Sequence, residues 1–143
     1  MSPELLFSET RLLFHTLKQW AEALHHKLPV SVPMRAVLEL LLLRGASTVP
    51  DMARARGVTR QHIQQQVDVL LDQELVVRKD NPAHKRSSLI ELSDEGRALI
   101  QNMRGDELDA LSRLQVGVSD NAMAEAAHVL SSWRATLQRD ADR

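Results

Sequence analysis

Apolar residues recur at helical spacing along the first part of the chain. This stripe consists of Leu6, Leu13, Leu17, Trp20, Leu24 and Leu28. Ser2 and Pro3 form a typical helix start, because a hydroxyl can cap free N–H groups and proline needs no partner in the first turn. Pro29 is expected to end this helix. Leu5 and Leu12 make the stripe wider than one buried helix face requires, so the pattern predicts a partner for this helix.

Three further helices are predicted before residue 73. The second opens at Ser31-Val32-Pro33 and stops at Gly45, and it should lie centrally because it is apolar nearly all round. A short third helix is capped by Thr48, with Asp51 three residues later, and ends at Gly57. The fourth helix runs from Thr59 to about Asp72, with three inward positions, Ile63, Val67 and Leu70.

The period then changes from helical to strand-like. Residues 75–79 and 88–92 are rich in β-formers and flank a polar loop with Asn81-Pro82, which predicts a hairpin with a long tip. Ser93 opens a fifth helix, whose apolar pattern continues to Leu114. Ser119-Asp120 opens the last helix, which is expected to bury Met123, Ala126 or Ala127, Leu130 and Leu137. The predicted order is α-α-α-α-β-β-α-α, a mainly α fold with a small β wing.

The informative stretch is a short capped helix, a tight turn and a longer helix, followed directly by the hairpin. Gly57 permits the positive φ of a helix-turn-helix turn. With about 100° per residue and Ile63 inward, Gln61 and Gln65 project most directly outward. Arg60 and Gln64 lie on one flank and His62 on the other. Amide and arginine side chains in the first turns of a helix suit base reading in a major groove; the alternative is an ordinary solvated helix face.

Charge supports this interpretation locally. The whole chain has a net charge of −1, which by itself disfavours a nucleic-acid binder. Residues 51–86, however, contain seven basic and five acidic side chains, a net +2, and the segment 54–66 has three arginines and no acid. A basic surface confined to the predicted helix-turn-helix is typical of DNA binding.

Composition and the absence of known motifs argue against several other classes of protein. The chain has no cysteine, no apolar run long enough to span a membrane, and no start typical of a signal peptide, so we expect a cytoplasmic protein with no membrane association. It has no glycine-rich phosphate loop and no nucleophile with a recognisable histidine and carboxylate partner. We therefore expect no enzymatic activity and no cofactor.

The histidines deserve separate consideration as metal ligands. His25, His26, His15 and His128 could contribute to such a site, but adjacent histidines on a helix point about 100° apart and no pair has i, i+4 spacing. Surface or interface histidines are the preferred interpretation, and no metal site is assigned.

Two segments resemble the MarR family of regulators. The stretch from Val49-Pro50-Asp51-Met52-Ala53 to Leu75-Val76 is similar to its helix-turn-helix. Residues 81–96, with Asn-Pro, the paired basic Lys85-Arg86, a strand, Leu92-Ser93 and Gly96, resemble its wing signature. This chain departs from the family pattern at His84, where the family commonly has an acid, and at Glu74, where it commonly has glycine.

The resemblance implies a winged helix-turn-helix homodimer clasped by its N- and C-terminal helices. Residues 1–143 would form a single winged-helix domain, with 1–30 and 94–143 as dimerisation helices and 31–93 as the DNA-binding lobe. It further implies two recognition helices in successive major grooves and a wing arginine, Arg86, in the minor groove. The predicted DNA-binding residues are Arg54, Thr59, Arg60, Gln61, His62, Gln64, Gln65, Lys85, Arg86 and Ser87.

The function implied is that of a transcriptional regulator, most often a repressor, that binds an inverted-repeat operator in double-stranded DNA. A small, often aromatic, effector would release the protein from DNA. Its binding pocket would lie between the first two helices and the recognition lobe. Two alternatives are a winged-helix module that binds protein and not DNA, and a metal-responsive regulator.

Overall fold

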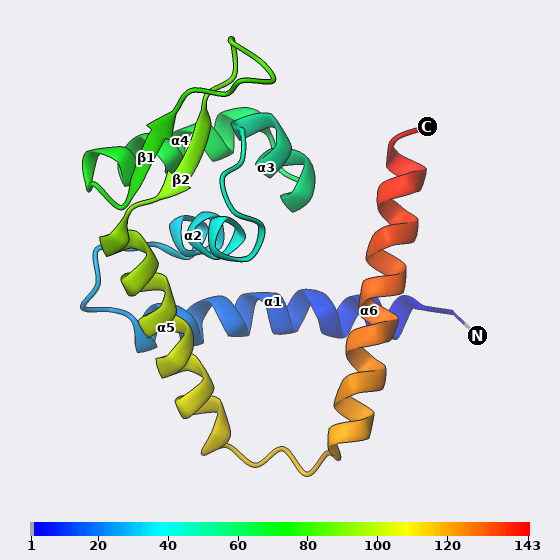
Figure 1. The fold of residues 1–143 in the computed structure, drawn as a ribbon. Coiled ribbons are helices and arrows are strands. Elements are labelled where there is room, and N and C mark those ends of the chain that lie inside the picture. Colours follow the sequence, from blue (N-terminus) through cyan, green and yellow to red (C-terminus); the bar gives the residue numbers. More distant parts are fainter. Residues whose placement is uncertain (1) are drawn as a thin grey trace. The chain divides into compact units, whose positions relative to one another are not determined.

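The structure, a computed structural model, describes residues 2–143 and contains the predicted order of elements within them (Figure 1). The elements are α1 (Glu4–Leu24), α2 (Val32–Arg44), α3 (Val49–Arg56), α4 (Arg60–Asp72), β1 (Val76–Lys79), β2 (Leu89–Leu92), α5 (Asp94–Ser112) and α6 (Asp120–Ala141). The predicted fold class, mainly α with a two-stranded antiparallel wing, is confirmed.

The chain forms two compact units, which meet in the sequence near the end of α5. The first ends at Asp109, and the second is Ala110–Arg143. The first unit therefore contains α1 to α4, the hairpin and most of α5, and the second contains α6 and the segment before it.

Hydroxyl caps begin five of the helices at the predicted positions. The side-chain oxygens of Ser31, Thr48, Thr59, Ser93 and Ser119 each accept a hydrogen bond from the backbone N–H three residues further on, at 3.0–3.2 Å. Each cap satisfies a donor that the helix itself cannot pair, and caps of this kind contribute about 1 kcal/mol each.

The first helix ends earlier than predicted. It stops at Leu24, and Leu28, predicted as part of its apolar stripe, lies in the turn that follows. The residue before a proline is disfavoured in the helical region, so Pro29 acts upstream of its own position. His25, at the end of the helix, also turns its ring toward Glu107, with Nε2 3.1 Å from a carboxylate oxygen. Similarly, α5 ends at Ser112, before Leu114.

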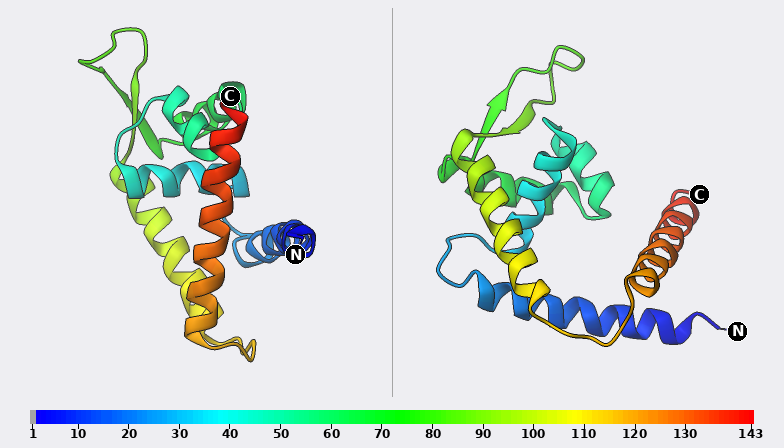
Figure 2. Two further views of the ribbon diagram at one scale, coloured as in Figure 1. Left: turned by 90° about the vertical axis from the view of Figure 1, so that its right-hand side faces the viewer. Right: turned by 60° about the horizontal axis from the view of Figure 1, so that its bottom comes forward.

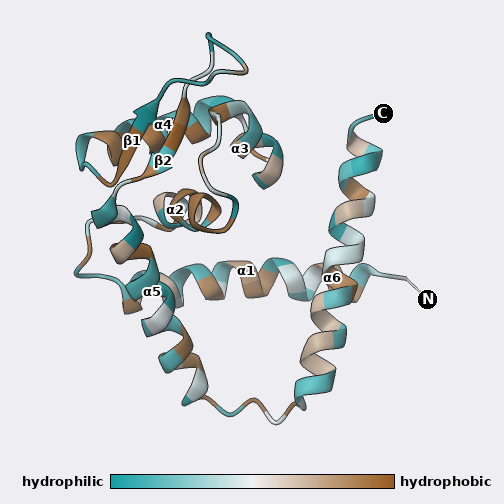
Figure 3. Cartoon of the chain, viewed as in Figure 1, coloured by the Kyte–Doolittle hydropathy of each residue, from teal (hydrophilic) through white to brown (hydrophobic). Residues whose placement is uncertain are grey.

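The core of the first unit is built around α2, as its apolar sequence predicts. Val37, Leu38 and Leu41 are almost completely buried, and Figure 3 shows α2 apolar nearly all round. Residues of both strands and of α5 contribute to the same core. The predicted inward residues of α3 and α4 also pack there, namely Met52, Ala53, Ile63, Val67 and Leu70.

The single chain leaves the apolar face of α6 exposed, so the predicted burial of this face is not met within one chain. No residue of α6 is buried, and Met123, Leu130 and Leu137 are 46%, 39% and 51% exposed. An amphipathic helix buries its stripe only against a second element, and the unit 110–143 contains no other long helix.

The hairpin is attached to the helices by a tight junction at Leu75. The Leu75 carbonyl accepts the N–H of Ser93 at 3.1 Å, and the Ser93 hydroxyl donates to the Glu74 carbonyl at 2.7 Å. Glu74 has a φ of 59°, a left-handed conformation that costs a non-glycine residue about 1 kcal/mol. This conformation explains why glycine would be favoured at position 74.

Gly96 is required at the same junction. A Cβ atom on Gly96 would lie 1.9 Å from the Leu75 carbonyl oxygen, a backbone atom that cannot rotate away. The first turn of α5 thus packs directly on the chain that leaves α4.

We predict that Gly96→Ala lowers the free energy of unfolding by about 3 kcal/mol, because the junction must open to admit the methyl group. Gly105→Ala is the matched control, since Gly105 lies within α5 with open space around it. This control should raise stability by about 0.5–1 kcal/mol through helix propensity. Urea unfolding of both variants measures the difference, and equal stabilities would contradict the close approach at Leu75.

Candidate nucleic-acid interface

The helix-turn-helix is formed by α3, a glycine turn and α4. Gly57 adopts a left-handed conformation, with φ 67° and ψ 35°, as its place after the short helix predicts. The N–H of Val58 returns to the Ala53 carbonyl at 3.1 Å, which closes the turn. Thr59 then caps α4 through the N–H of His62, so the first turn of α4 is well defined and faces away from the core.

One face of the β1–β2 hairpin packs on the core at its base and continues into the wing. Val76 pairs with Leu92 and Arg78 with Ile90, so these four side chains share one face of the hairpin. An isolated bridge joins Ser47 to Ile90 on the other edge of β2, with backbone hydrogen bonds of 2.8 and 3.0 Å. Figure 2 shows the hairpin tip projecting beyond α3 and α4.

A groove of about 450 Å³ lies between the start of α4 and this face of the wing. Its walls come from the start of α3, the first turns of α4 and both sides of the hairpin. The lining residues are Val49, Pro50, Arg60, Gln61, Gln64, Arg78, Arg86, Ser87, Ser88 and Ile90.

Three guanidinium groups in the groove carry unneutralised charge. Within residues 2–143, Arg60, Arg78 and Arg86 form no ion pair. Two nearby acids neutralise cations that do not line the groove. Asp51 pairs with Arg54, and Glu91 pairs with Lys79 at 2.6 Å. The groove therefore carries three unpaired positive charges, in spite of the chain's net charge of −1.

The structure brings five of the predicted DNA-binding residues together and leaves five outside the groove. Arg60, Gln61, Gln64, Arg86 and Ser87 line it. Thr59 acts as the helix cap, His62 is half-buried, and Gln65 is exposed without lining the groove. Arg54 pairs with Asp51, and Lys85 lines a separate hollow of about 420 Å³ at the wing tip with Asp80, Asn81 and Pro82.

Arg78 lines the groove but was not among the predicted site residues. Strand alternation contains the signal, because Arg78 lies two residues after the buried Val76 and so faces the same side. Near the base of the hairpin this face packs on the hydrophobic core, and nearer the tip the same face forms a wall of the groove.

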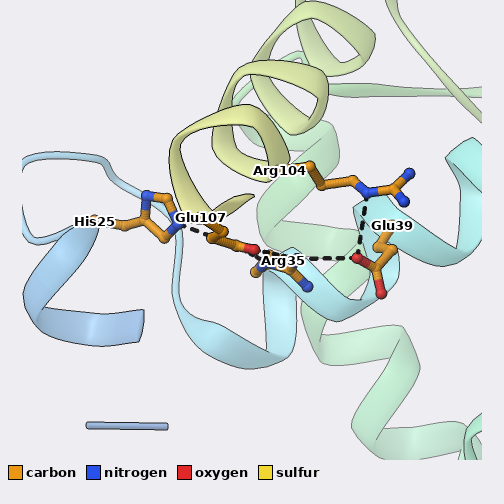
Figure 4. A network of polar contacts seen from close by, with 5 residues as sticks. All are labelled: His25, Arg35, Glu39, Arg104 and Glu107. Carbon is orange, nitrogen blue, oxygen red and sulfur yellow. Dashed lines mark hydrogen bonds and ion pairs between the residues drawn. The ribbon is translucent and has the colours of Figure 1, made fainter. Parts of the chain in front are cut away.

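A second polar cluster lies away from the wing and joins α1, α2 and α5 (Figure 4). The Arg35 guanidinium donates to both carboxylate oxygens of Glu107 at 2.5 Å and to Glu39 at 2.9 Å. His25 contacts the same Glu107, and Arg104 lies 3.7 Å from Glu39. Burial lowers the pKa of Arg35, but the hydrogen bond and charge of Glu107, together with Glu39, outweigh burial and raise it.

Beside this cluster is a hollow of about 210 Å³ between α1 and α2. Its walls are mainly apolar, and charged groups lie at its edge; the lining residues are Phe14, Leu17, Lys18, Trp20, Ala21, Val32, Arg35, Ala36, Arg56 and Glu107.

Three of the four histidines considered as possible metal ligands have other partners. His25 contacts Glu107, His26 Nδ1 lies 3.0 Å from the Ala23 carbonyl, and His15 stacks edge-on with Phe14. Among residues 2–143, no three histidine, cysteine or acidic side chains are grouped to hold a metal ion. No helix in the same range is long and apolar enough to cross a membrane.

Comparison with known proteins identifies relatives of the winged-helix lobe. The sequence model of the MarR family matches residues 33–87, from the start of α2 to the wing tip. The uncharacterized protein Mb2034c of Mycobacterium bovis is 35% identical over 78 residues, which are 54% of this chain and 54% of that protein. The match thus spans about half the length of the curated relative.

Solved structures match over nearly the whole chain. The MarR family transcription regulator SP03579 is 26% identical, with a TM-score of 0.81, over 98% of this chain and 93% of that one. Reduced AbfR bound to DNA shares the fold at 18% identity, with a TM-score of 0.71 and coverages of 95% and 91%.

A third structure concerns the regulation of DNA binding of Bordetella bronchiseptica BpsR by 6-hydroxynicotinic acid. It shares the fold at 19% identity, with a TM-score of 0.68 and coverages of 88% and 98%. The family match on the recognition lobe and the fold shared along the chain agree with the resemblance seen in the sequence. Residues 33–87 therefore match the MarR family, and the chain as a whole shares the fold of MarR-family winged-helix structures.

Proposed function

We propose that this protein is a transcriptional regulator that binds a specific sequence in double-stranded DNA. The observation that carries the proposal is the groove between α4 and the wing, where Arg60, Arg78 and Arg86 carry unpaired positive charge. Three guanidinium groups around one groove suit a phosphate backbone or a narrow minor groove. A surface that binds proteins would be expected to have an apolar centre, and the cations in this groove do not favour that alternative.

In the proposed complex the first turns of α4 occupy a major groove. Gln61 and Gln64 lie at the start of the helix, where side chains reach base edges. Arg86 and Ser87 on the wing would contact the adjacent minor groove and its phosphates. The DNA-bound AbfR structure supports this placement, because it has the same fold. The proposal locates the protein in the cytoplasm with the chromosome, where it represses transcription by covering a promoter.

Arg86→Ala should weaken binding to a selected operator by about 1–3 kcal/mol, the usual cost of one lost site contact. Arg86 forms no ion pair within residues 2–143, so the thermal stability should remain close to that of the wild type. The matched control is Arg97→Ala, which removes the same charge from an exposed position on α5.

The measurement is fluorescence anisotropy with operator and scrambled duplexes at two salt concentrations. Arg97→Ala should bind as the wild type does, and wild-type affinity should fall steeply with salt. Equal binding by Arg86→Ala and Arg97→Ala would show that the wing does not contact DNA.

We also propose that the active form is a homodimer on an inverted-repeat operator. The terminal helices carry apolar side chains that the single chain leaves exposed: Leu5, Leu12 and Leu13 on α1 are 73%, 60% and 60% exposed, and Leu137 on α6 is 51% exposed. Such contiguous stripes are typical of an interface that buries about 2,000 Å² or more.

Sedimentation equilibrium at low micromolar concentration should therefore show only dimer. Leu12→Glu should shift the protein toward monomer, because it places a charge within the apolar stripe. Gln19→Glu adds the same charge at another exposed position of α1 and should leave the dimer intact. A folded wild-type monomer at this concentration would refute the homodimer.

A small aromatic acid is the proposed effector, held in the hollow between α1 and α2. Phe14, Leu17 and Trp20 offer apolar walls, and Arg56 is an exposed cation at the edge. Arg35 lies in the same wall but is already paired with Glu107, so an incoming carboxylate would compete for it and loosen the contact between α2 and α5. The regulation of BpsR by 6-hydroxynicotinic acid supports this class of ligand.

The effector can be tested through the tryptophans, since Trp20 lines the hollow. In a Trp133→Phe background, benzoate and 6-hydroxynicotinic acid should change Trp20 fluorescence in a saturable way and lower operator affinity. Arg56→Gln should weaken the response about tenfold, whereas Arg44→Gln, which removes a charge at the end of α2, should not. Identical titrations of these two variants would exclude Arg56 from the site.

A further inference from the structure

The side-chain amide of Gln64 is hydrogen-bonded to the carboxylate of Asp68, one helical turn further along α4. Its Nε2 lies 2.8 Å from Asp68 Oδ1. An ionised carboxylate can only accept, so the amide must present its nitrogen to Asp68. The carbonyl oxygen Oε1 is consequently on the opposite side of the side chain.

This hydrogen bond distinguishes Gln64 from the other glutamines at the start of the recognition helix. Gln64 lines the groove beside Arg60 and Gln61, whereas Asp68 does not. No side-chain hydrogen bond of Gln61 or Gln65 is found within the described part of the chain, so their amides are free to turn. Asp68 forms no ion pair there, and its negative charge persists beside the amide.

We propose that Gln64 and Asp68 act together to read an exocyclic amino group in the major groove, the N6 of adenine or the N4 of cytosine. The inference rests on the proposed function, because it requires α4 to lie in that groove. Gln64 touches the base, and Asp68 is the positioning residue.

The chemistry of the base edges supports this selectivity. Adenine and cytosine present an amino donor in the major groove, and guanine O6 and N7 and thymine O4 are acceptors. Asp68 accepts one of the two N–H donors of the Gln64 amide and so holds the nitrogen on its own side, which leaves the acceptor oxygen to face the amino group. The adjacent carboxylate repels acceptor atoms, so guanine and thymine are disfavoured. A glutamine free to turn would tolerate either kind of edge.

The test begins with selection of bound sequences from a random DNA pool by the wild type, Asp68→Ala and Asp72→Ala. Each variant loses one exposed negative charge from α4, so both should bind random DNA slightly more tightly. The wild type and Asp72→Ala should select an adenine or cytosine at one position in each half-site. Asp68→Ala should accept guanine or thymine there.

The second step removes the amino group itself. In the selected operator, purine replaces adenine, or 2-pyrimidinone replaces cytosine, at that position. Wild-type affinity should fall about tenfold, and the affinity of Asp68→Ala should change much less.

An unchanged preference in Asp68→Ala, or no loss of wild-type affinity when the amino group is removed, would overturn this inference and leave the proposed function intact. A wild type that selects no sequence at all would overturn both.

Discussion

The position of the wing depends on one close backbone contact. Leu75 lies just after the recognition helix, and its carbonyl oxygen accepts a hydrogen bond from the N–H of Ser93. The first turn of α5 packs on the same carbonyl. Because Gly96 has no side chain, the end of α4, the base of the hairpin and the start of α5 meet in one place. This junction sets the angle between the recognition helix and the wing, and so the width of the groove that both line.

Charge in this protein is organised by pairing rather than by composition. The chain is nearly neutral overall, yet two acids beside the groove are engaged by cations outside it, Asp51 by Arg54 and Glu91 by Lys79, and the unpaired Asp68 lies outside the groove lining. The arginines within the groove are left without partners among residues 2–143. A local field of this kind can attract DNA without making the whole surface basic, which limits binding to other polyanions.

Local signals predicted most of the lobe, because they require only neighbouring residues. Hydroxyl caps at Thr48 and Thr59, the left-handed Gly57 and the spacing of Ile63 each act within a few residues and appear as expected. The features that were missed depend on distant parts of the chain. Arg78 reaches the groove through its register with Ile90, and α1 ends early where His25 meets Glu107 and the chain approaches Pro29. The apolar face of α6 has no counterpart in its own unit, so burial could not be judged from its periodicity.

The proposed position of DNA, in the groove between α4 and the wing, can be tested by DNA cleavage from the protein surface. Because the sequence has no cysteine, single substitutions allow an iron chelate to be attached at chosen sites. Ser87→Cys places the chelate on the groove, and Glu95→Cys places it at an exposed position on α5, at the base of the hairpin. We expect focused cleavage of the bound operator from position 87, at symmetric positions in its two halves, and little from position 95. Equal cleavage from both positions, or none from position 87, would show that DNA does not lie in this groove.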